Sequence, residues 1–533
     1  MIRATMMNVP LTLGHVLERA RRVFSGSEIV SRLPDRSLHR YAYSDFERRA
    51  RALGGALQCL GLAKGDRVAT LMWNHYAHLE AYFGVPCASG VLHTLNLRLH
   101  PEEIAYIVNH AGDRFLIVDD VLLPLYEKFR GSVSLERVIV VPLTAGKVSD
   151  ALDYEELIGN AHEFSVQPLD ENDAAAMCYT SGTTGRSKGV VYSHRSIVLH
   201  TLATATKDSL GVSRTDSVCP VVPMFHVNAW GLPYTAVMMG SKLVMPGPHL
   251  DPVSLLDLYE SERVTLTAGV PTIALGMQQC LDREPERWKL VPDLRMVVGG
   301  AAASDSLFRG LDRHRVRAVH GWGMTETSPV GLINCETAHD RDDVTYAARA
   351  MAGSPLPFFE IRAVSEAGEV EWDGRQMGEL QVRGPWVACA YHELPDSTEQ
   401  WTRDGWFRTG DVCTIDRDAC VRITDRIKDL VKSGGEWISS IELENALVSH
   451  PAVQEAAIIA VPHAKWGERP LGIVVLKAGM SATREALNAH IGSRFASYAV
   501  PDDYVFVSEI PRTSTGKMLK AKLRETYKDW RWT

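Results

Sequence analysis

Hydrophobic positions near the start of the chain follow first a helical and then an extended pattern. Apolar residues recur at helical spacing between positions 46 and 57. Ser44 and Glu47 stand at capping-box spacing at the front of this stretch, and Gly61 follows its last apolar position. We therefore expect a helix capped at Ser44 that ends before Gly61. The apolar run from Val68 to Met72 then predicts a buried strand.

The same alternation continues over roughly the first three hundred residues. Helical stretches are separated there by short apolar runs that have the length of a strand. These runs are Phe115–Val118, Val138–Val141, Leu266–Val270 and Met296–Val298. Because strands that alternate with helices pack as layers, the pattern predicts an α/β fold with largely parallel sheets.

The pattern changes after about residue 375. The stretches GELQVRG, GWFRTGDV and CVRITDRIKDLV are rich in β-forming residues and closely punctuated by Gly and Asp. The last hundred or so residues return to a mixed pattern, with strands expected near Ala456–Val461 and Gly472–Leu476 and a helix from about Thr483. A short joint between domains is therefore expected in the stretch DRIKDLVKSGG.

Composition and charge narrow the class of protein. A chain of 533 residues is too long for one hydrophobic core, and 45% hydrophobic with 23% charged residues is ordinary for a soluble protein. A net charge of −8 without a long basic run argues against a nucleic-acid partner. The nine cysteines form no C-x-x-C pair, which favours reduced thiols over disulfides or a zinc site. With no secretory signal and no apolar run of ~20 residues, we expect a cytoplasmic protein and not an integral membrane protein.

The stretch YTSGTTGRSKGVVYSH, from Tyr179 to His194, suggests phosphate binding. Its spacing fits neither a Walker loop nor a dinucleotide fingerprint. The ingredients are nevertheless suitable, since glycines let backbone amides approach an anion, hydroxyl groups donate to phosphate oxygens and Lys188 adds a positive charge. The alternative is a polar surface loop.

Four further stretches combine glycine with polar or charged residues. They are VVGGAAAS from Val297, GWGMTETSP from Gly321, WFRTGDV from Trp406 and PRTSTGKMLK from Pro511. Each has a structural explanation when taken alone: Trp322 as a core aromatic, Glu326 as a solvated charge, Asp411 in a turn after a strand, and Lys517 as a solvated lysine.

Taken together and in order, these stretches resemble the adenylate-forming superfamily, which includes acyl-CoA synthetases, luciferases and peptide-synthetase adenylation domains. The resemblance covers essentially the whole chain. PMFHVNAWGLPY and DRIKDLVKSGGEWISSIELENAL look like the medium- and long-chain fatty acyl-CoA synthetases, and relatives that activate methylmercaptopropionate share them. Two positions depart from the family pattern: Arg186–Ser187 replace the usual proline segment before Lys188, and Trp322 replaces the commoner tyrosine.

The resemblance implies both a fold and a reaction. The fold would be α/β, with a large N-terminal domain (1–427) of layered α/β sheets plus a distorted β-barrel and a small mobile α+β C-terminal domain (428–533). The reaction would be that of an ATP-dependent carboxylic acid:CoA ligase, which forms acyl-AMP and pyrophosphate and then acyl-CoA and AMP. ATP, Mg²⁺ and coenzyme A would be required, the acid would be a medium- or long-chain fatty acid, and a homodimer is expected.

The resemblance also assigns residues to ATP and coenzyme A. They are Thr180, Ser181, Gly182, Thr183, Thr184, Gly185, Lys188, Gly300, Ala301, Ala302, Gly321, Trp322, Gly323, Met324, Asp411, Arg426, Lys428, Lys432, Ser433, Gly434, Gly435, Glu436 and Trp437. Those from Thr180 to Lys188 would hold the β- and γ-phosphates, and those from Gly300 to Ala302 would bound the adenine together with Trp322. Asp411 would accept hydrogen bonds from both ribose hydroxyls, with Arg426 beside it.

The catalytic set implied by the resemblance is Lys517, Glu326, Thr325 and His226. Glu326 and Thr184 would bind Mg²⁺, and Thr325 would contact the α-phosphate. Lys517 would reach the carboxylate and the α-phosphate during adenylation.

The acid itself would be bound by His226, Val227, Trp230 and Gly323, with Trp230 as the gate of the acyl tunnel. For His226 and Trp230 the alternative is packing in the core. For the second half-reaction, the small domain would rotate about Lys428 and bring the segment from Ser433 to Trp437 to the thiol tunnel.

Other functions stay open at this point. A ligase for a short thioether acid, or an acyl-AMP ligase that loads a carrier protein, would use the same first step. A non-catalytic adenylate sensor would be expected to lack Lys517, Glu326 or Asp411, and all three are present.

Overall fold

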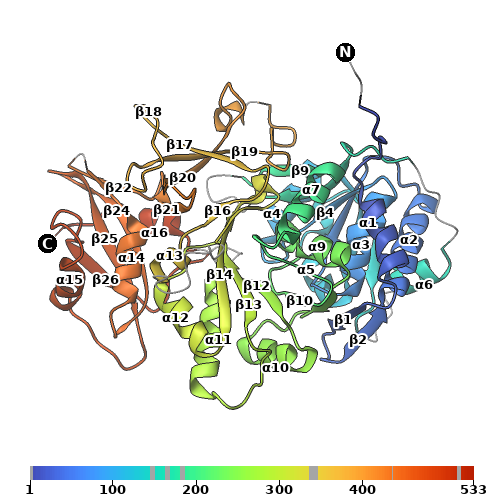
Figure 1. Cartoon of the computed structure of the whole chain (residues 1–533), viewed down its shortest axis with the longest axis horizontal. Coiled ribbons are helices and arrows are strands. Elements are labelled where there is room, and N and C mark those ends of the chain that lie inside the picture. The colour runs from blue at the N-terminus through green and yellow to red at the C-terminus, as the bar shows by residue number, and fades with distance from the viewer. Residues whose placement is uncertain are drawn as a thin grey trace.

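The computed structural model describes residues 4–144, 151–161, 168–180, 186–334, 346–395, 397–434, 436–512 and 518–532. Figure 1 shows the N-terminal half on the right, a central yellow-green part, and the C-terminal hundred residues in orange and red on the left. No helix within these ranges is long and apolar enough to cross a membrane.

One sheet of the N-terminal part is almost wholly parallel. It runs in the order β7 (Leu152–Asp153), β6 (Arg137–Val141), β5 (Asp113–Asp119), β3 (Arg67–Leu71), β4 (Val91–Thr94), β8 (Ala174–Tyr179) and β9 (Gly189–Ser193). The pairing of β8 with β9 is antiparallel and the others are parallel. The strands predicted near residues 68, 115 and 138 are β3, β5 and β6, so these predictions are confirmed.

A second sheet has a parallel centre with antiparallel edges. Its order is β2 (Leu38–Ala42), β1 (Glu28–Arg32), β11 (Lys242–Met245), β10 (Ser217–Pro220), β12 (Leu266–Gly269), β13 (Leu294–Gly299), β14 (Val316–Gly323), β15 (Val330–Ile333) and β16 (Ser354–Pro355). The strands from β1 to β14 are parallel, and β2, β15 and β16 run against their neighbours. The runs predicted near residues 266 and 296 are β12 and β13.

Helices fill the space between these two sheets and cover their outer faces. The largest apolar cluster joins both sheets through α1 (Leu13–Val23), α2 (Tyr43–Cys59), α3 (Tyr76–Cys87), α7 (His194–Ala205) and α9 (Leu232–Met239). The outer face of the second sheet packs on α10 (Pro252–Glu262), α11 (Pro271–Arg283) and α12 (Asp305–Arg313), and that of the first packs on α4 (Pro101–Ala111). The α/β layering predicted from the sequence is confirmed.

The predicted capping box of α2 is wrong. The helix begins at Tyr43, its N-cap is Ala42 without a side-chain cap, and Ser44 lies inside the first turn. The Tyr43 ring is fully buried and its hydroxyl donates to the carbonyl oxygen of Ser241, 2.6 Å away. Burial of this aromatic ring, rather than a polar cap, therefore fixes the start of the helix. The predicted end is confirmed, because Gly61 follows the C-cap with a φ of +92°.

The β-rich region predicted after about residue 375 belongs to an antiparallel sheet. Its order is β18 (Gly368–Glu369), β17 (Glu360–Ser365), β19 (Gly378–Arg383), β20 (Phe407–Ile415) and β21 (Val421–Arg426). The Val421 amide donates to the Gly353 oxygen and the Ala352 amide donates to the Val421 oxygen, which joins this sheet to the edge of the second sheet. The predicted turn at Asp411 is wrong, because Asp411 lies within β20 and pairs with Arg426 of β21.

The C-terminal residues form a small α+β unit with its own apolar clusters. Its sheet runs in the order β23 (Glu436–Ile438), β22 (Val431–Ser433), β25 (Gly467–Leu476) and β24 (Val453–His463), with β26 (Asp503–Phe506) beside β25. Helices α14 (Ser440–Val448) and α15 (Arg484–Gly492) pack on one face, and α16 (Lys520–Thr526) packs on the other. The helix predicted from Thr483 is confirmed, since the Thr483 side chain caps α15.

Candidate active site

Two cavities meet where β13 and β14 end. The smaller, of about 480 Å³, is lined by Thr180, Lys188, residues 226, 227 and 230, and residues 321–326. The larger, of about 1080 Å³, lies between residues 300–307 and the C-terminal unit. Their linings share Gly300, Gly321, Trp322, Gly323, Arg426 and Lys428. The carboxyl ends of adjacent parallel strands are the usual place for a ligand in such a sheet.

Glycines at this junction allow neighbouring chain segments to approach closely. A Cβ atom on Gly299 would lie 2.6 Å from the Gly321 oxygen and 3.0 Å from the Trp230 ring, and one on Gly323 would lie 2.0 Å from the Pro329 oxygen. Gly300 has a φ of +80°, where side chains are strained. The sequence GGAA therefore continues β13 as bare backbone along the larger cavity, as predicted for a wall that faces a flat ring.

Asp411 is the centre of a buried polar group. It is 4% exposed, the Trp322 indole nitrogen donates to its Oδ2 over 2.8 Å, and the Arg426 Nε lies 3.0 Å from its Oδ1. The Asp411 charge raises the pKa of Arg426. The structure thus brings together three residues predicted to hold the nucleoside, and it gives Trp322 a hydrogen bond that the sequence did not predict.

The predicted phosphate loop begins and ends at a tight pair of bonds. The Thr180 amide donates to the Lys188 oxygen over 2.9 Å, and the Lys188 amide donates to Thr180 Oγ1 over 3.0 Å. Ser181, Gly182, Thr183, Thr184 and Gly185 lie outside the described residues. The closed base nonetheless presents Thr180 and Lys188 to the smaller cavity.

A buried carboxylate lines the smaller cavity together with Thr180 and Lys188. Glu326 is 6% exposed, follows Thr325 on the cavity wall, and accepts a 2.6 Å hydrogen bond from the Tyr391 hydroxyl. Lys188 Nζ lies 4.7 Å from the centre of the Tyr391 ring. Sequence reasoning missed Tyr391, because it stands in an irregular stretch without periodicity or glycine punctuation.

The predicted acyl side lines the smaller cavity as well. His226, Val227 and Trp230 face it together with Val297 and Val330. Residues Val227 to Trp230 form a left-handed turn with φ from 45° to 58° before Gly231 at 76°. This turn carries the Trp230 ring over Gly299. The alternative that His226 and Trp230 are wholly packed in the core is not supported, because both line the cavity.

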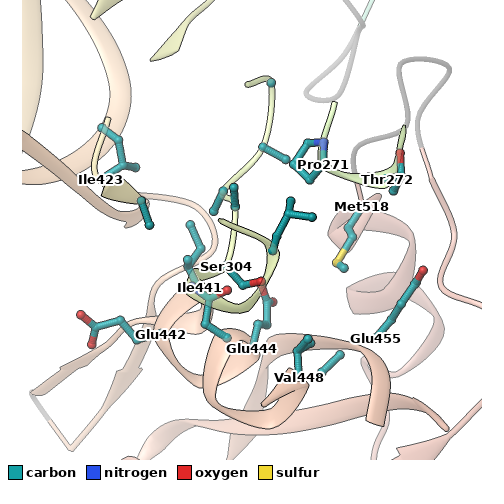
Figure 2. Close-up of a pocket in the computed structure, with 18 of the residues that line it drawn as sticks. Pro271, Thr272, Ser304, Ile423, Ile441, Glu442, Glu444, Val448, Glu455 and Met518 are labelled. Carbon is teal, nitrogen blue, oxygen red and sulfur yellow. The ribbon is translucent and has the colours of Figure 1, made fainter. Parts of the chain in front are cut away.

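The C-terminal unit turns one predicted segment toward the cavities and another away. Met518 and Lys520, which follow Lys517 in the sequence, line the larger cavity, and Figure 2 shows Met518 near Pro271 and Thr272. Among the described residues, Lys432, Ser433, Gly434, Glu436 and Trp437 line neither cavity, and the Trp437 side chain is 46% exposed. Lys517 and Gly435 lie outside the described residues.

Comparison with known proteins identifies the family. The model of the family "AMP-binding enzyme" matches residues 17–392, and that of the "AMP-binding enzyme C-terminal domain" matches residues 442–517. The chain is an AMP-binding enzyme. Of the residues shared by its two cavities, Gly300 and residues 321–323 lie within the first matched region, and Arg426 and Lys428 lie between the two matched regions.

Relatives of this AMP-binding enzyme match over nearly its full length. A long-chain-fatty-acid–CoA ligase of Thermus thermophilus is 48% identical over 99% of this chain and 97% of its own. A medium-chain-fatty-acid–CoA ligase of Ectopseudomonas oleovorans is 42% identical over 98% and 97%. A 3-methylmercaptopropionyl-CoA ligase of Ruegeria lacuscaerulensis is 42% identical over 98% of each chain.

Solved structures agree in fold. The ATP-bound structure of MatB from Rhodopseudomonas palustris has a TM-score of 0.84 at 25% identity, and it covers 98% of this chain and 99% of its own. The anthranilate CoA ligase AuaEII, in complex with anthranoyl-AMP, has a TM-score of 0.86 at 24% identity over 98% of each chain. The large and small parts of the AMP-binding enzyme are therefore both present in these neighbours.

The donor set of the AMP-binding enzyme fits a magnesium ion that arrives with a nucleotide. The described residues contain no group of three or more His, Cys, Asp and Glu side chains that could hold a metal ion. Mg²⁺ at nucleotide sites is typically held by one or two carboxylates together with phosphate oxygens. A single buried carboxylate, that of Glu326, beside the base of a phosphate loop meets this requirement.

Proposed function

We propose that this protein is an ATP-dependent carboxylic acid:CoA ligase, which forms acyl-AMP with release of pyrophosphate and then acyl-CoA with release of AMP. The observation that carries the proposal is the junction at residues 321–323. Asp411 lines the larger cavity on one side of this junction. Lys188, Glu326 and Trp230 line the smaller cavity on the other side. The three curated relatives, all named as CoA ligases, support the same reaction.

The first step brings two anions together. The acid carboxylate attacks the α-phosphorus of ATP, a new O–P bond forms, and the bond to pyrophosphate breaks with its electron pair. The protein must therefore position the groups and neutralise charge. We assign the β- and γ-phosphates to Thr180 and Lys188, the α-phosphate to Thr325, and the ribose hydroxyls to Asp411. Lys517 would reach the carboxylate from the small domain.

Magnesium belongs to this proposal as a partner of ATP. Glu326 would hold it, with Thr184 as the second predicted ligand. When bound, the ion neutralises phosphate charge. The Glu326 carboxylate accepts a hydrogen bond from the Tyr391 hydroxyl over 2.6 Å.

For the second step we propose that residues 428–533 rotate about Lys428. Lys428 lines both cavities, and burial, with Arg426 nearby, lowers its pKa. Rotation would withdraw Lys517 and bring the segment 433–437 to the cavity. The thiol of coenzyme A would then attack the acyl carbonyl, forming a C–S bond as the bond to AMP breaks. A hinge of this kind absorbs a backbone change without touching the reacting atoms.

A medium- or long-chain fatty acid is the proposed substrate, with a short thioether acid as the alternative. The apolar wall formed by Val227, Trp230, Val297 and Val330 favours an apolar acid in either case. A homodimer and a cytoplasmic location stay predictions, and sedimentation of the purified protein tests the former.

Pyrophosphate release tests the reaction. Acids of three to sixteen carbons, together with thioether and aryl acids, are incubated with ATP and Mg²⁺, with and without coenzyme A. We expect turnover that requires coenzyme A and peaks at one chain length. Release of about one equivalent despite coenzyme A would point to a carrier-protein acceptor. No release with any acid would refute the ligase proposal in favour of a sensor.

The role of Lys517 has a separate test. Lys517→Ala should abolish pyrophosphate release while leaving thioester formation from supplied acyl-AMP intact, because Lys517 acts only in the first step. Lys522→Ala, at an exposed lysine of α16, is the matched control and should leave both steps unchanged. Equal loss of both half-reactions in Lys517→Ala would contradict the role.

A further inference from the structure

Tyr391 contacts the two opposite charges of the smaller cavity at once. Its hydroxyl donates to Glu326 Oε1 over 2.6 Å, and Lys188 Nζ lies 4.7 Å from the centre of its ring. The tyrosine is 8% exposed, and Glu326 is 6% exposed, so the hydrogen bond between them is largely shielded from water. A hydrogen bond to a carboxylate and a cation over an aromatic face are each attractive, and each strengthens when water is excluded. One side chain therefore fixes both charges.

The backbone on either side of Tyr391 forms hydrogen bonds with the segments that carry Glu326 and Lys188. The Ala388 amide donates to the backbone carbonyl oxygen of Glu326 over 2.7 Å. The His392 amide donates to the backbone carbonyl oxygen of Gly189, the residue after Lys188, over 2.9 Å. The Trp401 indole nitrogen in turn donates to the Ala388 oxygen over 2.7 Å. The segment 388–392 thus connects the carboxylate loop to the end of the phosphate loop, and Tyr391 stands at its centre.

We propose that Tyr391 is a positioning residue for the metal–ATP complex. It fixes the Glu326 carboxylate toward the metal, and its ring holds the Lys188 ammonium away from that carboxylate, so that the two charges stay available to phosphate and metal. This inference rests on the proposed function, in which both charges serve ATP.

Binding of Mn²⁺ with a non-hydrolysable ATP analogue, followed by electron paramagnetic resonance, tests this without turnover. Tyr391→Phe keeps the ring over Lys188 and removes only the donor. Loss of a group that orients a metal ligand typically weakens metal binding about 10- to 100-fold, and we expect a weakening of that order. The KM for the acid should not change, whereas the Mg²⁺ concentration for half-maximal pyrophosphate release should rise.

Tyr154→Phe is the matched control. Tyr154 is fully buried, and its hydroxyl donates to the buried carboxylate of Glu80 over 2.7 Å, outside the linings of both cavities. Its loss should leave Mn²⁺ binding unchanged. An equal weakening in both variants would overturn the proposal, since it would reflect general loosening of the fold.

A double variant isolates the interaction. If Tyr391 acts through Glu326, adding Tyr391→Phe to Glu326→Gln should weaken Mn²⁺ binding no further. Independent losses in the double variant, or wild-type Mn²⁺ binding in Tyr391→Phe, would overturn the inference about Tyr391 while the wild-type enzyme still releases pyrophosphate. Failure of the wild-type enzyme to release pyrophosphate with any acid would instead remove the proposed function on which the inference rests.

Discussion

Replacing Lys520 with methionine measures what one buried cation contributes to the small C-terminal unit. Lys520 is 9% exposed, and its Nζ lies 2.6 Å from Glu444 Oε1 and donates to Ser440 Oγ over 2.6 Å. The Ser440 amide and hydroxyl both donate to Asp425 Oδ2 over 2.6 Å. Asp425 lies in β21, so this cluster connects β21 with α14 and α16.

The expected loss of unfolding free energy follows from the two carboxylates that the substitution leaves without a cation. Burial raises the pKa of Glu444 and of Asp425 even with Lys520 opposing it. Methionine fills similar volume but leaves both carboxylates without their cation. Removing one partner of a buried ion pair typically costs about 3–5 kcal/mol, and we expect a loss of unfolding free energy in that range at pH 8.

The pH dependence has a definite sign. Without Lys520, the pKa of Glu444 in the folded state rises further above its unfolded value. An acid with a raised folded pKa contributes stability that is fully present below the unfolded pKa and is lost as pH rises through the folded pKa. The deficit of Lys520→Met should therefore be smaller at pH 5 than at pH 8.

Hydrogen exchange of the β24 and β25 amides in increasing urea reports the unfolding of this unit by itself. Lys465→Met is the control, because Lys465 is exposed and its Nζ lies 4.4 Å from the centre of the Trp466 ring, outside the cluster. It should cost less than about 1 kcal/mol, as for a surface charge. A similarly small loss in Lys520→Met, or a loss that stays constant from pH 5 to pH 8, would refute the reasoning.

Three further changes probe the cavities. Trp230→Ala should shift kcat/KM toward longer acids, by about fourfold for each added methylene at ~0.8 kcal/mol; an unchanged chain-length curve in the pyrophosphate assay would leave Trp230 a packing role only. Gly323→Ala places a Cβ 2.0 Å from the Pro329 oxygen and should cost at least about 1–3 kcal/mol in thermal unfolding, while Gly26→Ala, with nothing within 4 Å, should not. Asp411→Asn should raise the KM for ATP about tenfold or more, at 1.5–3 kcal/mol for a charged hydrogen bond, without changing the KM for the acid.

The pattern of apolar residues predicted the strands that are buried on both faces. The apolar runs near residues 68, 266 and 296 are central strands, because such strands are covered on both faces and their hydrophobic residues are contiguous. The start of α2 and the strand at Asp411 were mispredicted for a common reason. Tyr43 is held by Ser241 and Asp411 is paired with Arg426, and neither partner is near in sequence.

The candidate site likewise contains residues that the sequence predicted and residues that it could not predict. The glycine-rich stretches pointed to Gly299 and Gly323, where the close approach of another chain segment excludes a side chain. Tyr391 could not be found from the sequence, since its importance arises only from the distant residues Lys188 and Glu326 that it touches. The position of Trp230 in the wall of the smaller cavity is equally hidden, because it depends on the left-handed turn from Val227 to Trp230.

That turn reverses a common rule of protein engineering. Val227, Asn228, Ala229 and Trp230 look like a short helix in their hydrogen bonding, yet all have positive φ. A left-handed conformation costs roughly 1–2 kcal/mol for each residue that carries a Cβ. Glycine usually weakens a helix, but Ala229→Gly would relieve this cost and should raise the melting temperature. A consensus or design protocol that scores these positions by helix propensity would choose the wrong residue at the wall of the smaller cavity.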